Sequence, residues 1–355
     1  MSNKFYSLQV SDIRHETPSC VSVSFEIPAE LKASFNFESG QYLTFKKQHN
    51  NEEIRRSYSL CSAPDENEWR VAIKQIPDGV FSSYANHELK IGDTLDVLAP
   101  MGNFKFSPNP SAKKNYVLFA AGSGITPIFS ILKTILTQEP QSMVTLFYGN
   151  KGQAEVIFRE ELEAIKNKYL NRLNLIHVFS RENLGVALLK GRIDAERTEK
   201  LLEAFAKGQQ IDAAYLCGPQ QMILSAKDQL EKFGMASTNI HFELFHAEPI
   251  QVKEETKTNV AAFDSHIELI MDGEVTDFYL SSQGPTILDA AYKAGADAPF
   301  ACKGGVCCTC KAKVLKGEVS MDINYALTPE EVEQGYVLTC QAHPKSTEVL
   351  ISFDD

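Results

Sequence analysis

The feature that most constrains the fold of this chain is a set of four cysteines near its carboxyl end: Cys302, Cys307, Cys310 and Cys340. The first three follow the pattern C-x4-C-x2-C, and 29 residues separate the third from the fourth. This is the ligand spacing of plant-type [2Fe–2S] clusters, in which one tight loop and one distant segment bring four thiolates to two bridged irons. Because such a cluster carries single electrons, the spacing predicts an electron-transfer protein.

Zinc and disulfides are the alternative readings of the cysteines. Zinc sites usually contain paired C-x2-C units, and here only Cys307 and Cys310 form one. Disulfide frameworks are typical of small secreted domains, whereas this chain has 355 residues and begins MSNKFYSLQV, without a signal-like apolar core. Small residues favour a cluster, because glycine lets the loop aim backbone N–H groups at sulfur. The small residues of the loop are Gly304, Gly305 and Thr309. The cysteines outside the ligand pattern, Cys20, Cys61 and Cys308, are interpreted as buried core residues.

The acidic charge of the chain is concentrated at its cysteine-bearing end. The formal net charge is −11, which argues against sequence-independent binding of nucleic acid. Residues 264–355 contain 15 Asp and Glu against 6 Lys and Arg, a formal net charge of −9. An acidic end can steer docking to a basic partner, and a merely solvated surface explains the charge equally well.

One stretch, residues 116–136, has the length of a membrane span. Gly122, Gly124 and Pro127 interrupt it and Lys133 lies within it, so a strand, a glycine turn and a helix are the better interpretation. We therefore expect no membrane insertion and a cytoplasmic location.

The length of the chain suggests two to three domains, and the pattern of apolar and polar residues changes at three places along it. Residues 1–108 contain short alternating apolar and polar segments, which predict an antiparallel β-barrel. Strands and helices alternate over 109–245, which predicts an α/β domain with a parallel sheet and ligands at the carboxyl ends of its strands. A polar, aperiodic linker is expected over 246–263. Regular structure is predicted again over 264–355, where Asp272–Gly273 is typical of a hairpin turn and the four cysteines follow.

Two segments of the first domain carry residue types suited to a flavin. RRSYSL, at residues 55–60, places a cation, an aromatic ring and a hydroxyl alternately on a predicted strand. Residues Gly79–Ser83 open a predicted helix whose amino end can hold a diphosphate. Each segment alone is also explained by ordinary structure, as a half-buried strand and as a helix with Ser82 at its N-cap.

Two segments of the second domain suit a dinucleotide. Residues Gly122–Pro127, GSGITP, join a predicted strand to a helix, with Thr126 expected at the N-cap and Pro127 at the first helical position. The glycines permit close approach to a pyrophosphate. Residues Cys217–Pro219, CGP, end another strand, where a partly exposed thiol would line a nicotinamide pocket and a buried cysteine is the alternative.

In this order, the segments RSYS, GVFS, GSGITP and CGP and the four cysteines resemble the ferredoxin–NADP reductase superfamily with a carboxy-terminal ferredoxin domain, over nearly the whole chain. RRSYSLCS, AGSGITP and CKGGVCCTC are similar to the subgroup of phenylacetate-degradation reductases. The resemblance implies a multidomain protein: a β-barrel that binds FAD, an α/β domain that binds NAD(P)H, and a β-grasp domain with the [2Fe–2S] cluster.

The resemblance also implies particular contacts. The resemblance implies that Tyr58 packs along the flavin and that Ser59 approaches the redox-active edge of the flavin. It also implies that Arg56 contacts a phosphate of the cofactor. The implied FAD-binding residues are Arg56, Ser57, Tyr58, Ser59, Ile73, Lys74, Gly79, Val80, Phe81, Ser82 and Ser83, with Phe245 close to the flavin. The implied nicotinamide-nucleotide residues are Gly122, Gly124, Thr126, Cys217 and Gly218. Ser59 and Cys217 are the catalytic candidates.

The choice between related cofactors rests on a few residues. Relatives often carry glycine where this chain has Asp78, an acidic residue unfavourable beside a diphosphate. A related phthalate-type reductase uses FMN, so FAD is preferred and FMN is the alternative. Ser180 and Arg181 match a pair that contacts the 2′-phosphate of NADPH in relatives, and arginine suits a dianion. This favours NADPH, with NADH and a merely solvated Arg181 as alternatives.

The three cofactors together predict a reductase. A nicotinamide gives up two electrons as a hydride and the cluster accepts one at a time, so a flavin must stand between them. The chain lacks the paired Glu-x-x-His set of di-iron helical bundles, so its acceptor is a different protein. The resemblance implies a separate multisubunit di-iron oxygenase, phenylacetyl-CoA 1,2-epoxidase. Another oxygenase, a hydroxylase or a fatty-acid desaturase fits the same physics, and a zinc-holding carrier or a flavin reductase with a damaged cluster are the rival classes.

Overall fold

The computed structural model describes residues 4–50, 52–246 and 262–355. Nearly all of the expected linker lies outside the described residues. The chain forms two compact units, one made of residues 6–100 and 104–245 and the other mainly of the residues after 245. In the described ranges, no helix is both long and apolar enough to cross a membrane.

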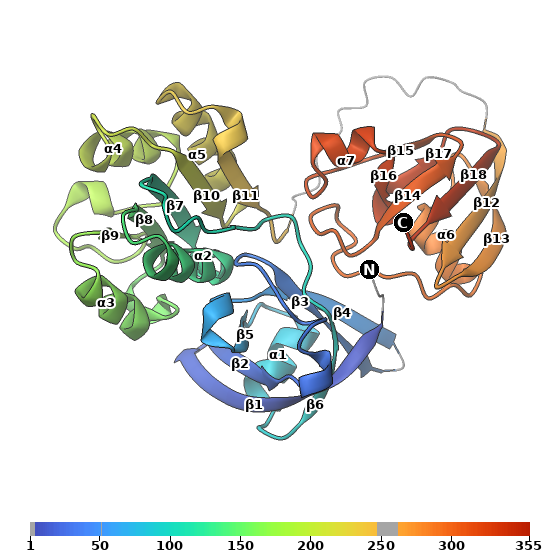
Figure 1. Ribbon diagram of the computed structural model, residues 1–355, viewed down its shortest axis with the longest axis horizontal. Helices are drawn as coiled ribbons and strands as arrows, with labels where there is room; N and C mark the ends of the chain where they lie inside the picture. Colours follow the sequence, from blue (N-terminus) through green and yellow to red (C-terminus); the bar gives the residue numbers. More distant parts are fainter. Residues whose placement is uncertain (1–3, 51, 247–261) are drawn as a thin grey trace. The chain divides into compact units, whose positions relative to one another are not determined.

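The amino-terminal part is a six-stranded antiparallel sheet with the order β4-β3-β6-β1-β2-β5 (Figure 1). Its strands are β1 (Phe5–Thr17), β2 (Cys20–Glu26), β3 (Tyr42–His49), β4 (Glu52–Ser59), β5 (Trp69–Lys74) and β6 (Thr94–Leu98). An isolated antiparallel bridge between Leu60 and Val71 joins the ends of the two outer strands. The sheet therefore closes into the expected antiparallel barrel, which removes its exposed edges.

The helix α1 (Val80–His87) lies against β5. The side-chain amide of Asn86 donates to the carbonyl oxygen of Ile73 at 3.0 Å, so the helix is tied to the end of that strand. Phe81 and Ala85 of α1 belong to the barrel core with Phe45 and Val71. The backbone N–H of Ile76, two residues after β5, donates to the hydroxyl of Ser82 at 3.3 Å, so the amino end of α1 also lies close to the carboxyl end of β5.

The second part of the same unit is a five-stranded parallel sheet with the order β11-β10-β7-β8-β9. Its strands are β7 (Asn115–Ala121), β8 (Met143–Asn150), β9 (Leu173–Phe179), β10 (Ala213–Cys217) and β11 (Ile240–Glu243). The helices are α2 (Ile125–Gln138), α3 (Arg159–Lys168), α4 (Ala195–Phe205) and α5 (Gln220–Lys232). The chain builds β7, β8 and β9 in one direction and then adds β10 on the other side of β7. The strand order therefore reverses between β7 and β10.

Both faces of the parallel sheet are covered. Leu118 of β7 and Tyr148 of β8 lie in a core cluster with α2. The adjacent residues of these strands, Phe119 after Leu118 and Phe147 before Tyr148, contact each other at 4.9 Å between ring centroids, and Phe147 also contacts Phe205 of α4 at 6.0 Å. Strands buried on two faces need continuous apolar runs such as YVLFAA, which explains the absence of alternation there.

The helix after β7 begins earlier than the sequence predicts. Gly122–Gly124 form a 3-10 turn that leads directly into α2, so Gly124 takes the N-cap position and Ile125 is the first helical residue. Thr126 lies inside the first turn, where its hydroxyl donates to the carbonyl oxygen of Ser123 at 3.0 Å. The prediction of an N-cap at Thr126 is wrong, because the glycine turn already has helical geometry instead of the extended backbone of a capping residue.

The barrel and the parallel sheet share one hydrophobic core. Cys20 and Cys61 of the barrel are buried in the same cluster as α2, which confirms their interpretation as core residues. The fully buried hydroxyl of Ser130 on α2 donates to the carbonyl oxygen of Ser62 at 2.6 Å. This buried hydrogen bond joins α2 to the barrel.

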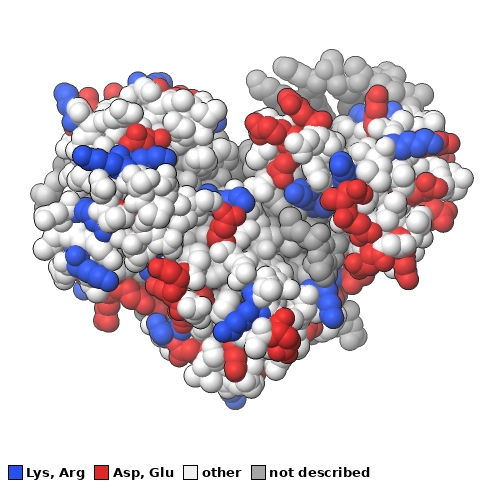
Figure 2. All heavy atoms as spheres, viewed as in Figure 1, with Lys and Arg blue, Asp and Glu red and all other residues white. Residues whose placement is uncertain are grey.

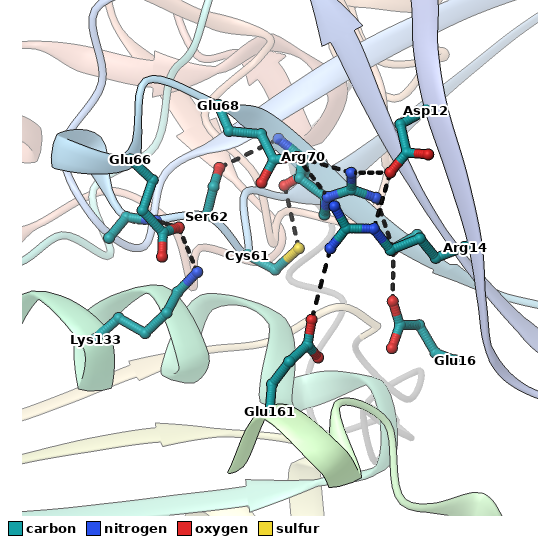
Figure 3. Close-up of polar contacts among 12 residues, drawn as sticks. Asp12, Arg14, Glu16, Cys61, Ser62, Glu66, Glu68, Arg70, Lys133 and Glu161 are labelled. Carbon is teal, nitrogen blue, oxygen red and sulfur yellow. Dashed lines mark hydrogen bonds and ion pairs between the residues drawn. The ribbon is translucent and has the colours of Figure 1, made fainter. Parts of the chain in front are cut away.

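Ion pairs surround this shared core (Figure 3). Lys133 of α2 pairs with Glu66 of the barrel, and Arg14 of β1 lies 3.8 Å from Glu161 of α3. Exposed pairs of this kind contribute about 0–1 kcal/mol each, so they add orientation more than stability.

The last unit contains a mixed sheet with the order β13-β12-β18-β14-β16. Its strands are β12 (Asp264–Met271), β13 (Glu274–Ser281), β14 (Lys311–Lys316), β16 (Tyr336–Leu338) and β18 (Glu348–Ser352), and β15 (Val319–Met321) pairs with β17 (Ala342–Pro344). The helices are α6 (Ile287–Lys293) and α7 (Pro329–Glu333). Asp272 and Gly273 have φ of 51° and 78°, the left-handed pair that a tight hairpin needs, so the predicted hairpin is confirmed.

The arrangement of this unit is the expected β-grasp. β12 pairs in parallel with β18 and antiparallel with β13. Ile287 and Leu288 of α6 pack in one core with Ile267 and Leu269 of β12. Figure 2 shows acidic side chains spread across the visible face of this unit, in keeping with its sequence charge of −9.

Candidate functional site

The candidate nucleotide site lies where the carboxyl ends of β7 and β10 are adjacent. Ala120 of β7 pairs with Cys217 of β10, so the glycine turn after β7 and the turn after β10 lie side by side although they are far apart in sequence. In open parallel sheets, ligands bind outside the carboxyl ends of the strands where the strand order reverses. The fold thus brings the GSG and CGP segments together at that place.

The two glycines of the first turn are required for different reasons. Gly122 has φ of 53°, a left-handed conformation that glycine adopts without penalty. At Gly124, a Cβ would lie 2.3 Å from the carbonyl oxygen of Cys217, so only glycine fits against β10. The turn can therefore present its N–H groups at the amino end of α2, which favours an anionic ligand.

Cys217 is fully buried, and its expected partial exposure is wrong. Burial raises the pKa of the thiol well above its usual value, and the nearby Glu243 raises it further. The thiol therefore stays protonated at neutral pH. The structure places the backbone of Cys217 against Gly124, and its side chain is closed off from solvent.

A carboxyl group that no sequence motif marks connects the barrel to this site. The hydroxyl of Ser59, the last residue of β4, donates to Oε2 of Glu243 at 3.1 Å, and Glu243 ends β11. Burial raises the pKa of Glu243 to about 8, and the hydrogen bond from Ser59 opposes this rise. Glu243 is therefore largely protonated at neutral pH. Its only sequence signal is a lone acidic residue in the apolar segment FELF.

The remaining predicted residues of β4 lie on a half-buried strand. Tyr58 packs on Phe45 and Phe81, with ring centroids 6.0 and 5.6 Å away, and Arg56 is exposed. Ser57 shares a hydrogen bond with Thr44 at 2.8 Å. Burial does not alternate strictly along RRSYSL, because Arg55, Ser59 and Leu60 are buried and Ser57 and Tyr58 are both half-buried. Phe245, two residues after Glu243, is 41% exposed.

The segment before α1 differs from the sequence-based alternative. Gly79, not Ser82, occupies the N-cap, and Ser82 lies in the first turn, where its hydroxyl donates to the carbonyl oxygen of Gly79 at 3.1 Å. Phe81 is buried, whereas Val80 is exposed and Ser83 is half-buried. The helix end is therefore open to a ligand on one side only.

Asp78 has φ of 57° and so occupies a left-handed position. Glycine is the residue favoured in this conformation, and aspartate is one of the few others that adopt it at low cost.

Lys74 stands between the two groups of predicted residues. It ends β5 beside the buried Ile73, and its Nζ lies 3.6 Å from the point where Gly122 would carry a Cβ. A cation of the barrel therefore reaches the glycine turn of the parallel sheet. It is placed to meet an anionic group bound at that turn as well as one bound at the barrel.

Ser180 and Arg181 directly follow β9. Their backbone N–H groups donate to the carbonyl oxygens of Asn150 and Lys151 at 2.9 Å each, which fastens this turn to the end of β8. Glu182 accepts a hydrogen bond from the backbone N–H of Gln153 at 2.7 Å. In the described part of the chain, the exposed guanidinium of Arg181 makes no hydrogen bond or ion pair, so it is free to meet a phosphate.

The four cysteines of the predicted cluster converge. The sulfur atoms of Cys302 and Cys307 are 3.1 Å apart, Cys302 also contacts Cys340, and Cys340 contacts Cys310. The backbone N–H of Gly304 donates to the Cys302 sulfur at 3.3 Å. Four adjacent thiols with backbone donors aimed at sulfur are the donor set that a [2Fe–2S] cluster needs.

The loop around these thiols shows why glycine is needed and where one expectation is wrong. Gly305 has φ of 69°, and a Cβ there would lie 2.9 Å from the carbonyl oxygen of Ile323. Cys308 is only half-buried, with its sulfur 3.4 Å from the carbonyl oxygen of Ala326, so it is not the fully buried filler expected.

Comparison with known families matches all three parts of the chain. Residues 7–106 match an oxidoreductase FAD-binding domain, residues 118–228 an oxidoreductase NAD-binding domain, and residues 271–345 a 2Fe-2S iron-sulfur cluster binding domain. The cofactors are therefore FAD, a nicotinamide nucleotide and a [2Fe–2S] cluster.

Individual relatives match along the whole chain. A subunit of the 1,2-phenylacetyl-CoA epoxidase of Escherichia coli K12 is 41% identical, with 99% of this chain and 98% of the relative covered. The ferredoxin reductase component of the 3-ketosteroid-9-alpha-monooxygenase of Rhodococcus rhodochrous is 33% identical, with coverage of 98% and 96%. The solved structure of phthalate dioxygenase reductase has the same fold, with a TM-score of 0.60, 22% identity and 98% coverage of both chains. The chain belongs to the family of NAD(P)H-dependent reductases that join FAD-binding, NAD-binding and [2Fe–2S] ferredoxin domains in one polypeptide.

Proposed function

We propose that this protein is the NADPH-dependent reductase of a phenylacetyl-CoA 1,2-epoxidase system and passes electrons to a separate, multisubunit di-iron oxygenase. The observation that carries this proposal is the 41% identity to the E. coli epoxidase protein over 99% of the chain. The match extends over nearly the whole chain rather than over the cofactor motifs alone.

A reductase for another oxygenase, a hydroxylase or a fatty-acid desaturase is the second candidate. It is supported by the 33% identity to the reductase component of a ketosteroid monooxygenase, again over nearly the whole chain.

When bound, FAD accepts a hydride and releases electrons singly to the [2Fe–2S] cluster, and the chain holds and orients these groups. We assign Tyr58 to the flavin ring, Arg56 to its phosphate and the amino end of α1 to its diphosphate. The other proposed FAD contacts are Ser57, Ile73, Gly79, Val80, Phe81, Ser82, Ser83 and Phe245. Cys302, Cys307, Cys310 and Cys340 are the proposed cluster ligands.

Ser59 and Glu243 are the proposed proton-holding pair beside the flavin. The pKa of about 8 keeps Glu243 protonated at neutral pH, and Ser59 donates to its Oε2. A neutral, hydrogen-bonded pair adds no charge at the place where a hydride must arrive. We assign Ser59 a catalytic role and Glu243 a positioning role. Cys217, buried and protonated, is reassigned from a reactive thiol to a packing residue behind the nicotinamide.

For the nicotinamide nucleotide, we propose that the turn at Gly122, Gly124 and Thr126 holds the pyrophosphate, with Gly218 beside the nicotinamide. Lys74 places its positive charge close to the pyrophosphate of the nicotinamide nucleotide and is also a proposed contact of FAD. The preference for NADPH rests on Ser180 and Arg181, since the free guanidinium suits the 2′-phosphate.

The test of the proposal is transfer of electrons to purified oxygenases. Protein reduced by NADPH without oxygen should be reoxidised fastest by the oxygenase components of a phenylacetyl-CoA epoxidase, with phenylacetyl-CoA converted when oxygen is admitted. Equal or faster reoxidation by a ketosteroid monooxygenase or a desaturase would favour the second candidate. NADH more efficient than NADPH would contradict the nucleotide assignment alone.

Cys340→Ser separates the two halves of the electron path. The variant should still reduce ferricyanide with NADPH at a rate close to that of the parent, because the flavin and nucleotide residues are untouched. Its transfer of electrons to the oxygenase should fall at least about a hundredfold, because the cluster loses a ligand. Loss of flavin reduction in this variant would contradict the proposed division of labour.

The domain boundaries 1–108, 109–245 and 264–355 and the cytoplasmic location remain predictions. Limited proteolysis would test the boundaries, with first cleavage expected within 246–263.

A further inference from the structure

Three polar side chains meet on one face of the parallel sheet below the glycine turn. Tyr148 of β8 and His177 of β9 are register neighbours with ring centroids 5.9 Å apart. Asn150 lies two residues after Tyr148 and therefore on the same face of β8. Tyr148 is fully buried and Asn150 is 8% exposed. Segment 156–158 and Leu162 of α3 share a core cluster with Tyr148 and so cover this face.

This place holds most of the unsatisfied polar atoms of the described chain. Four buried side-chain nitrogen or oxygen atoms in the described ranges have no hydrogen-bond partner, and three of them are Nδ2 and Oδ1 of Asn150 and Nδ1 of His177. An unpaired buried polar group costs about 1–3 kcal/mol, so native proteins rarely leave several together. Their concentration on one face indicates that a further molecule pairs with them.

The same group of side chains is connected to the dinucleotide turn. The hydroxyl of Tyr148 donates to the carbonyl oxygen of Gly122 at 3.2 Å. That carbonyl also accepts from the backbone N–H of Ile125, the first residue of α2. The side chain of Asn150 and the backbone of Ile157 interact with the Tyr148 hydroxyl, and both oppose the rise in the pKa of this phenol that burial causes. Among the described residues, neither amide atom of Asn150 has a hydrogen-bond partner of regular geometry. The orientation of the Gly122 carbonyl, and with it the direction of the N–H groups of the turn, thus depends on Tyr148.

We propose that one buried water lies between Asn150 and His177 and completes a hydrogen-bond chain through Tyr148 to the Gly122 carbonyl, which makes Tyr148 a positioning residue for the nicotinamide nucleotide. The second half of this inference rests on the proposed nucleotide role of the turn. The water itself does not depend on that role.

The chemistry of the site selects water over an ion. Asn150, His177 and Tyr148 present an amide, an imidazole and a phenol, none of which needs a charged partner. Burial lowers the pKa of His177, so the ring is neutral at neutral pH, although Glu163 lies 3.9 Å from its Nε2. The ligand must both donate and accept, because the unpaired atoms are an amide nitrogen, an amide oxygen and an imidazole nitrogen, and a water with two to four polar partners does so.

The first experiment locates the water. A crystal structure of the whole protein, at a resolution that shows ordered waters, should contain density within hydrogen-bond distance of Asn150 and of Nδ1 of His177. In Asn150→Leu the density should be absent, because the leucine fills the space and removes two of its partners. Direct hydrogen bonds from both side chains to protein groups, with no density between them, would overturn the proposal.

The second experiment measures what the chain of hydrogen bonds does for the nucleotide. Tyr148→Phe should raise the dissociation constant for the nucleotide roughly three- to tenfold, the loss of about one hydrogen bond. The rate of flavin reduction at saturating nucleotide should change by less than about twofold, because Tyr148 does not touch the reacting atoms. Stopped-flow reduction of the bound flavin separates the two quantities. An unchanged dissociation constant would overturn the positioning role.

Matched variants distinguish positioning from simple loss of packing. Tyr116→Phe removes another buried hydroxyl, which donates to Glu139 just after α2, and should lower stability without weakening nucleotide binding. His177→Phe should weaken binding like Tyr148→Phe, and His177→Gln, which keeps a hydrogen-bonding side chain, should restore it. Equal weakening in Tyr116→Phe would show a general packing effect and overturn the proposal. If the parent flavin is not reduced by either nucleotide, the proposed function fails while the crystallographic test still decides the water.

Discussion

At the scale of single residues, the most informative contact is that between Ser59 and Glu243. The two residues are 184 positions apart, and their 3.1 Å hydrogen bond forms only because β4 and β11 end at the same place. No local pattern marks Glu243, which explains why the sequence alone did not reveal it. Its pKa of about 8 gives this carboxyl a measurable consequence for stability.

The flavin-free protein should lose stability from this group as the pH rises. Glu243 has an ordinary pKa of 4.5 in the unfolded chain and about 8 in the folded one, so between these values the folded state binds more protons. Its contribution to the free energy of unfolding is therefore complete below about pH 4.5 and falls as the pH rises to about 8. Relative to Glu243→Gln, the parent should lose on the order of 4 kcal/mol between pH 5 and pH 8.5. Urea unfolding of both proteins across this range measures the difference, and parallel pH profiles would contradict the assignment.

Gly124→Ala should separate the two turns of the nucleotide site. The new Cβ would lie 2.3 Å from the carbonyl oxygen of Cys217, which is backbone and unable to rotate away. We expect a loss of about 1–3 kcal/mol in the free energy of unfolding and weaker nucleotide binding. Gly149→Ala is the matched control, because its nearest neighbour is the end of the flexible Ile193 side chain at 3.2 Å. Equal effects of both substitutions in urea unfolding would show that the contact with β10 is not the cause.

At the scale of elements, the turn before α1 combines two unfavourable features. Asp78 has a left-handed backbone and brings a negative charge toward the helix end proposed for the FAD diphosphate.

Asp78→Gly should therefore stabilise the turn and tighten FAD binding. Removing the left-handed aspartate should add up to about 1 kcal/mol to the free energy of unfolding. Asp78→Asn removes the charge and keeps a side chain, so it isolates the electrostatic part. Flavin fluorescence titrations and thermal unfolding measure both effects. Weaker FAD binding in either variant would place the diphosphate elsewhere.

Local periodicity predicted most of the elements, and tertiary contacts decided the places where it failed. The barrel strands, the alternating α/β part and the Asp272–Gly273 hairpin follow from short-range patterns that the structure confirms. The N-cap at Thr126 was wrong because the turn Gly122–Gly124 already has helical geometry, and the partial exposure of Cys217 was wrong because tertiary packing buries its side chain completely. The four cysteines were found because ligand spacing is a property of the sequence. The roles of the flavin and nucleotide residues stay predictions.

At the scale of the whole molecule, acidic charge is concentrated in the cluster-bearing part, where residues 264–355 carry −9 of the total −11. Figure 2 shows acidic side chains over the visible face of that unit. A field of one sign accelerates encounter with a partner of the opposite sign and does so less as salt is added.

Salt should therefore act in opposite directions on basic and acidic electron acceptors. Reduction of cytochrome c, a basic protein, should slow severalfold between about 0.02 and 0.3 M NaCl, because the screening length falls below about 10 Å. Reduction of ferricyanide, a small anion, should quicken or stay constant over the same range. Steady-state assays with saturating NADPH measure both. The same slope for the two acceptors would show that this charge does not steer docking.

The reversal of strand order between β7 and β10 has a consequence for biosynthesis. The chain leaves the ribosome with the GSG turn nearly one hundred residues ahead of the strand against which Gly124 rests, and Ser59 emerges long before Glu243. Neither of the two proposed coenzyme sites can be complete in a nascent chain that lacks β10 and β11. A polypeptide that stalls or is cleaved before β11 would therefore contain Ser59 without the carboxyl group that accepts its hydrogen bond.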